Sequence, residues 1–128
     1  MLKDSPAFSG YSVDDQSKAQ TFYSDILGLE LKDTGMGLEM HFVNGHTVFL
    51  YPKQDHTPAD FTVLNFPVDD INAAVDALVE KGVVFERYDN LPAPVDERGV
   101  LRGKDAGYGP NIAWFKDPAG NVLSVLEN

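Results

Sequence analysis

A glutamate and a histidine stand two residues apart in the segment LEMHFV. Glu39 and His41 fall on a stretch that we expect to be a β-strand, where residues two apart point to the same face. Such a pair can bind an ion or act as acid and base, although a solvent-facing hydrogen-bonded couple is the more common outcome. Both residues are therefore weak candidates for catalysis. The remaining histidines, His46 in an expected turn and His56 in an expected connector, are interpreted as surface residues.

The composition excludes several kinds of chemistry. The chain has no cysteine, so a disulfide framework, a thiolate zinc site and a cysteine nucleophile are impossible. No Ser-His-Asp pattern and no glycine-rich phosphate loop occur. Ten basic residues stand against twenty acidic ones, for a net charge of −10. Because no Lys/Arg cluster is present to neutralise phosphates, we expect neither nucleic acid nor a membrane as partner. The acidity could attract a cationic ligand, but a solubilising surface is the simpler interpretation.

The length and the hydropathy pattern predict one domain, residues 1–128, in the cytoplasm. A chain of 128 residues and 14.1 kDa is long enough to bury a proper hydrophobic core. Its first ten residues lack a basic stretch followed by an apolar run, and no segment approaches ~18 apolar residues.

The first half predicts a strand, a helix and three more strands. Residues 8–13 form the first strand, and Asp14 and Asp15 then stand where a helix would be capped. Apolar residues recur at helical spacing from there to Gly28, which ends the helix. The remaining strands are expected at 29–33, 38–43 and 47–51, the last two being a hairpin around Asn44-Gly45.

The second half repeats this order. A strand at 62–68 leads into the same Val-Asp-Asp tripeptide, and the cap-to-glycine distance differs by only one residue between the halves. Strands are expected at 83–87 and on either side of the Asp-Pro-Ala-Gly-Asn turn within 112–126. We place module one at about 7–52, a linker at 53–60 and module two at about 61–127. Only the segment 89–110 breaks the symmetry, with four glycines and three prolines. We interpret it as a lid over a cleft, the alternative being disorder.

This doubled pattern resembles the glyoxalase/bleomycin resistance/dioxygenase superfamily, also called vicinal oxygen chelate proteins. The segments that carry the resemblance are VDD through FYSDILGLEL, VDDINAAVDALVEKGVVFE and AWFKDPAGNVLSVLE. It implies an α+β fold in which two βαβββ modules form a curved, mixed eight-stranded sheet, with helices outside and a cup-shaped cleft inside. It also implies a homodimer, sometimes with modules exchanged between chains.

Metal-using members of this family hold the ion with His, Gln or Glu on the first and last strands of a module. The register of the motifs puts Phe8, Phe49, Val63 and Ser124 at these four places. These side chains cannot form a divalent-metal site, which needs imidazole or carboxylate ligands. A shift of one residue supplies no such ligand either. We therefore predict neither a metal nor any other cofactor.

Strand alternation, applied to this fold, divides the side chains between the cup and the helices. It predicts Ile112 and Trp114 on the cup side, and Ala113 and Phe115 against a helix. Aromatic side chains on the cup side suit a planar or hydrophobic ligand, which Tyr51 and Ser124 could orient. Arginines of the 89–110 segment could cover an anionic or carbonyl group of it. The alternative is that the aromatic rings fill the cup as core. The predicted ligand-binding residues are Phe8, Phe49, Tyr51, Trp114, Ser124, Arg98 and Arg102.

Three functions are compatible with these residues. The first is binding of a small aromatic or hydrophobic molecule without the family metal, as in sequestration of an antibiotic or a metabolite. The second is a lyase, isomerase or dioxygenase of the same superfamily with atypical or no metal ligands, in which Glu39, His41 or a residue of the 89–110 segment carries a proton. The third is a dimeric protein-interaction module. We favour the first, with a small molecule as the partner.

Overall fold

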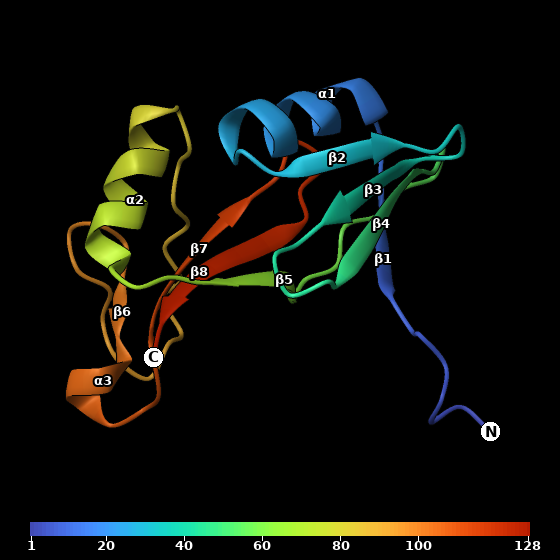
Figure 1. Cartoon of the computed structure of the whole chain (residues 1–128). Helices are drawn as coiled ribbons and strands as arrows, with labels where there is room; N and C mark the ends of the chain where they lie inside the picture. The colour runs from blue at the N-terminus through green and yellow to red at the C-terminus, as the bar shows by residue number, and fades with distance from the viewer. The chain divides into compact units, whose positions relative to one another are not determined.

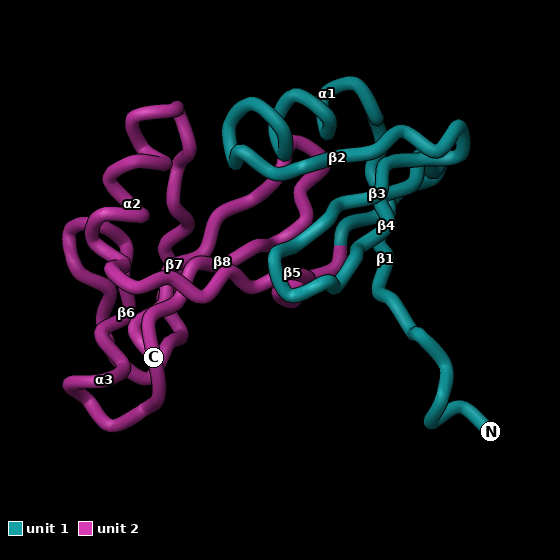
Figure 2. Tube along the Cα trace, viewed as in Figure 1, with its two compact units in different colours: residues 1–58 teal, residues 59–128 magenta.

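The computed structural model describes all 128 residues, which form two compact units, residues 1–58 and residues 59–128 (Figure 2). The boundary falls within the predicted linker 53–60. Each unit contains one four-stranded mixed sheet and a helix packed on one of its faces (Figure 1). The predicted α+β fold with two related modules is therefore confirmed. No helix is both long and apolar enough to span a membrane.

The first unit has the sheet order β1-β4-β3-β2. Strand β1 runs parallel to β4, and the other neighbours are antiparallel. Gly45 has a φ of 81° in the β3–β4 turn, which only glycine adopts without strain. The elements are β1 (Ser9–Val13), α1 (Gln16–Gln20), η1 (Thr21–Ile26), β2 (Glu30–Asp33), β3 (Leu38–His41) and β4 (Thr47–Pro52).

The helical segment of this unit begins as predicted and ends with a wider turn. The Asp15 carboxylate accepts a hydrogen bond from the Lys18 N–H and caps α1. From Thr21 to Ile26 the segment is a π-helix, and the Leu27 N–H bonds to the Phe22 carbonyl five residues back. This module has one residue more between its cap and its terminating glycine than the second module. The π-turn accommodates that additional residue.

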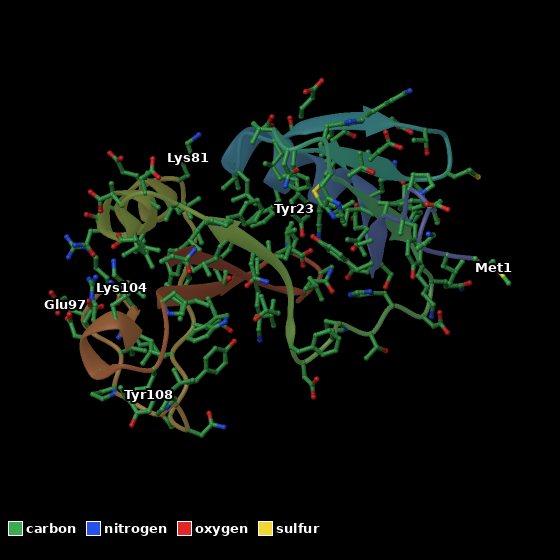
Figure 3. The ribbon with its side chains drawn as sticks, turned by 60° about the horizontal axis from the view of Figure 1, so that its bottom comes forward. Met1, Tyr23, Lys81, Glu97, Lys104 and Tyr108 are labelled. Carbon is green, nitrogen blue, oxygen red and sulfur yellow. The ribbon has the colours of Figure 1, made fainter.

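The core of the first unit lies between this helix and one face of its sheet. Ala19, Phe22 and Tyr23 face the strands, and Tyr23 donates to or accepts from the Tyr11 hydroxyl at 2.7 Å (Tyr23 is labelled in Figure 3). Burial of a large apolar side chain such as Phe22 contributes roughly 1.5–3 kcal/mol. The buried strand residues alternate with exposed ones, as expected for a sheet with one covered face. They are Val13, Leu38, Met40, Val48 and Leu50.

The second unit repeats the topology in the order β5-β8-β7-β6. Strand β5 runs parallel to β8, with an irregularity between Thr62 and Leu64. Asp70 caps helix α2 by accepting a hydrogen bond from the Ala73 N–H. The helix buries Ile71 and Val75, while Ala113 and Phe115 are buried in the sheet. The elements are β5 (Thr62–Pro67), α2 (Ile71–Glu80), β6 (Leu101–Arg102), α3 (Gly103–Ala106), β7 (Asn111–Lys116) and β8 (Val122–Glu127).

The predicted strand at 83–87 is wrong. Only Phe85 bridges to β7, opposite Phe115, and the Glu86 N–H bonds to the Trp114 carbonyl. The other end of the β7 edge is taken by β6, so two short segments share the place of one strand. Arg87 instead turns its guanidinium to the carbonyl oxygens of Asp96 and Glu97. Residues 86–100 separate these two pieces along the chain.

Candidate functional site

One face of the first sheet carries the predicted aromatic residues. On β4, Val48 and Leu50 are buried toward the helix, so Phe49 and Tyr51 lie on the opposite face, which we call the open face. Their rings stack with centroids 6.1 Å apart and planes 19° apart. Tyr51 is 37% exposed, which leaves ring surface accessible. Phe8 lies just before β1 and is also exposed.

The Phe49 ring is held in place by the backbone beneath it. A Cβ atom on Gly37 would lie 2.8 Å from Cζ of Phe49 and would clash with the Leu50 carbonyl oxygen. Glycine inside or beside a strand often marks such a close approach. The ring therefore packs against Gly37 on one side and stacks with Tyr51 on another, which fixes its orientation.

Glu39 and His41 lie on the same open face. Glu39 pairs in register with Phe49 and His41 with Thr47, and directly opposed residues of antiparallel strands share a face. The His41 Nε2 atom is 2.8 Å from Oε1 of Glu39, and each side chain is about one-third exposed. The structure thus brings together two sets of residues that the sequence presented separately: the acid–base pair and the aromatic stack.

A second histidine reaches the first unit's sheet from the connector. His56 Nδ1 lies 2.7 Å from Oγ of Ser12. Ser12 pairs in register with Tyr51 in the parallel β1–β4 ladder, so it shares the open face. Sequence reasoning missed both residues. Strand parity alone would have placed Ser12, but nothing in the sequence indicates where the connector positions His56.

In the second unit, Trp114 and Ser124 are neighbours across β7 and β8. The Trp114 indole N–H donates to Oγ1 of Thr62 at 3.2 Å, and its ring packs edge-to-face with Tyr88 at 5.6 Å. Ser124 is fully buried, and its hydroxyl donates to Oδ1 of Asn65 at 2.6 Å. Strand parity is as predicted, because Ala113 is buried toward α2 while Trp114 is half-buried on the other face.

The two predicted lid arginines bind helix α2. Arg98 forms a bidentate ion pair with Asp76, from Nε to Oδ1 at 2.9 Å and from Nη2 to Oδ2 at 3.2 Å. These hydrogen bonds lower the pKa of Asp76. Arg102 donates to Oδ1 of Asn72 at 2.6 Å and to Asp96 at 2.8 Å. Both guanidinium groups therefore lie on the helix side of the second sheet, and their expected role over a ligand stays a prediction.

The segment that carries these arginines contains a short hairpin. Val95 bridges to Leu101, and Gly99 has a φ of 85° in the turn. Burial by itself would raise the pKa of Asp96, but the Val100 N–H and the Arg102 guanidinium together lower it below its ordinary value. The hairpin is thus held by an ionised carboxylate at its own turn.

A family model for the glyoxalase/bleomycin resistance protein/dioxygenase superfamily matches residues 7–125. The chain belongs to this superfamily. A search of curated proteins found no match.

Three solved structures are similar in fold to this chain. A glyoxalase/dioxygenase from Nostoc punctiforme has a TM-score of 0.69 at 16% identity, covering 99% of this chain and 92% of that chain. A superfamily member from Sphaerobacter thermophilus has a TM-score of 0.64 at 24% identity, with 95% and 97% covered. TnmS3, an antibiotic binding protein from Streptomyces sp. CB03234, has a TM-score of 0.63 at 22% identity, with 97% of each chain covered.

The residues at the superfamily's metal-ligand places do not fit a divalent ion. Phe8, Phe49 and Val63 have no donor atom, and the hydroxyl of Ser124 is bound to Asn65. Within neither unit do three His, Asp or Glu side chains converge in a way that could hold a metal. The donors that the open face does offer, Glu39, His41 and His56, suit hydrogen bonding and proton transfer.

Proposed function

We propose that this superfamily member binds a small aromatic or hydrophobic molecule, an antibiotic or a metabolite, without the metal of its catalytic relatives. The observation that carries the proposal is the Phe49–Tyr51 stack on the open face of the first unit. Two rings held parallel by the sheet are a preorganised platform for a planar ligand, so little conformational entropy is lost on binding. The Trp114–Tyr88 pair supplies a second aromatic surface on the other unit.

The comparison with known structures supports the same function. TnmS3, described as an antibiotic binding protein, shares the fold over 97% of each chain. Micromolar affinity needs only about 8 kcal/mol, which ring stacking and burial of a planar ligand can supply. Homodimer formation, the cytoplasmic location and the absence of a cofactor stay predictions.

Binding is tested by titrating a library of aromatic metabolites and antibiotics into the ¹⁵N-labelled protein and following its amide resonances. We expect shifts centred on β4 and the neighbouring β3. Phe49→Ala and Tyr51→Ala should each weaken binding about tenfold, since loss of a stacked ring costs on the order of 1 kcal/mol plus its buried area. Tyr108→Ala, which removes an exposed ring outside both aromatic pairs, is the matched control (Tyr108 is labelled in Figure 3).

Two results would contradict this function. One is that no aromatic compound of the library shifts the amide resonances. The other is that the Phe49, Tyr51 and Tyr108 variants bind the ligand with equal affinity. A parallel melting experiment adds Ni²⁺, Zn²⁺, Mn²⁺ or Fe²⁺, because a ligand that binds the folded state raises its melting temperature. We expect no shift with these ions. A large shift would favour a metal-dependent enzyme.

A second function is favoured by one specific contact, the 2.8 Å approach of His41 to Glu39 beside the aromatic stack. A histidine held by a carboxylate is a competent proton carrier, so the open face could serve a lyase or an isomerase. Loss of turnover in His41→Ala, with aromatic binding retained, would identify this activity. Retention of binding without any turnover would leave the sequestering function alone.

A further inference from the structure

The charge beside the aromatic stack restricts which ligands the open face can take. Glu39 lies directly across from Phe49, so its carboxylate and the ring share one face, and Cβ atoms of opposed residues are about 5 Å apart. A planar molecule that stacks on Phe49 and extends along β3 toward His41 therefore also covers part of Glu39. Because a carboxylate that loses its water without a new partner costs several kcal/mol, the ligand has to bring a partner for it.

Few side chains of the protein are placed to pair with the Glu39 carboxylate. The contact with His41 uses Oε1 alone. Lys32 is opposite Glu39 on β2, but the two form no ion pair, and Lys32 is exposed. Glu30, next to His41 in the same ladder, adds a second negative charge to this face.

The unit as a whole reinforces the local charge. Residues 1–58 contain eight acidic residues, four lysines and no arginine, and every arginine of the chain lies in residues 59–128. A positive group approaching the open face is thus attracted by the surrounding field as well as by Glu39. The neighbouring rings stabilise it further, since a cation near a ring face gains from the quadrupole.

We propose that Glu39 is the specificity-determining residue of this site and selects aromatic ligands that carry a positive charge, such as an ammonium or amidinium group. The positive group would lie about one strand spacing, roughly 5 Å, from the ring that stacks on Phe49. This inference rests on the proposed function, because it concerns the same face, but it makes a separate claim about ligand charge.

Three probes with one ring system separate charge from stacking: naphthylmethylamine, naphthylmethanol and naphthoate. Each is titrated into the full-length protein at about pH 8, and affinity is measured from the amide shifts of β3 and β4. We expect the amine to bind about tenfold more tightly than the alcohol, and the carboxylate to bind most weakly.

The variants then assign the selectivity. In about 500 mM NaCl, where the field of the other carboxylates is screened, Glu39→Gln should bring the amine to the affinity of the alcohol while leaving the alcohol unchanged. Glu30→Gln, which removes an equal charge one strand further from the stack, is the matched control and should change the preference less than twofold. Equal binding of all three probes, or an amine preference that survives Glu39→Gln at this salt concentration, would overturn the charge selection while leaving aromatic binding intact. Binding of none of the three would count against the proposed function itself.

Discussion

At the scale of single residues, the position of one ring decides what the open face can do. Phe49 is stacked with Tyr51, packed on Gly37 and opposed by Glu39, so a neighbour on each of three sides limits its motion. A fixed ring binds a planar ligand with a smaller entropy loss than a mobile one. Gly37 is therefore a positioning residue for the site, although it has no side chain to offer a ligand.

The Gly37→Ala substitution tests this role. The new methyl group would press on Cζ of Phe49 and on the Leu50 carbonyl, and overpacking of this kind costs about 1–3 kcal/mol in the free energy of unfolding. The displaced ring should also weaken aromatic binding. Urea unfolding and a ligand titration on the same protein measure both effects.

Gly35→Ala is the comparison, because Gly35 has open space around it and only its φ of 85° is strained by a side chain. That variant should lose stability with no change in ligand affinity. A Gly37→Ala protein as stable as the wild type, with unchanged affinity, would remove Gly37 from the site.

Single residues also show which side-chain positions of the site follow from the sequence and which do not. Strand parity placed Phe49 opposite the buried Val48 and Leu50, and Trp114 opposite Ala113, because alternation is a direct consequence of strand geometry. Glu39 lies opposite Phe49 because of the register between two strands, which alternation within one strand does not determine. The approach of His56 to Ser12 depends on the path of a connector without periodicity, and no local pattern encodes such a path.

At the scale of elements, the helical segment of the first module is one residue longer than that of the second, and the additional residue lies in the π-turn. Asp15 and Asp70 are equivalent caps, but only the first helix widens into a π-turn at Thr21–Ile26. The turn lets the residues on either side keep their buried orientation. Without it, the additional residue would rotate the end of the helix by about 100°.

Deletion of Ser24 should therefore be tolerated. The π-turn would close to an ordinary α-helical turn, Phe22 and the residues after the deletion would keep their orientation, and stability should fall by less than about 1 kcal/mol. Deletion of Ala77 from the regular helix α2 is the matched control, since it rotates Leu78 and all that follows. Thermal and urea unfolding compare the two. Equal destabilisation by both deletions would show that the π-turn is not an accommodated insertion.

The sequence predicts the helices well, because each has both a capping residue and apolar residues at helical spacing. It does not predict the edge strand, because pairing at a sheet edge depends on which other segments compete for that edge. Asp15, Asp70 and the glycines at 28 and 82 mark the helix ends that the structure shows. The strand expected at 83–87 is absent because the edge of β7 pairs with Phe85 and, further along, with β6. The apolar residues of that segment are explained by the burial of Val83 and by the contact of Phe85 with Phe115. Neither requires that the segment form a hydrogen-bonded strand.

At the scale of the whole molecule, the net charge of −10 and the single carboxylate beside the stack make different predictions about salt. A long-range field from twenty acidic residues is screened within about 10 Å at 0.1 M salt and about 3 Å at 1 M. A contact between Glu39 and a bound ammonium group is shorter than either length. Charge selection by a contact should therefore persist where attraction by the field is lost.

The amine and alcohol probes distinguish these two contributions when titrated at about 50 mM and about 500 mM NaCl. We expect the amine affinity to fall several-fold with salt, because the field is screened, yet to stay above that of the alcohol, whose affinity should not fall. In Glu39→Gln the amine should keep the salt-dependent part of its affinity, because nineteen of the twenty acidic residues remain. It should lose the part of its preference over the alcohol that persists at high salt. If the amine preference of the wild type disappears entirely at high salt, the overall acidity and not Glu39 sets the ligand charge.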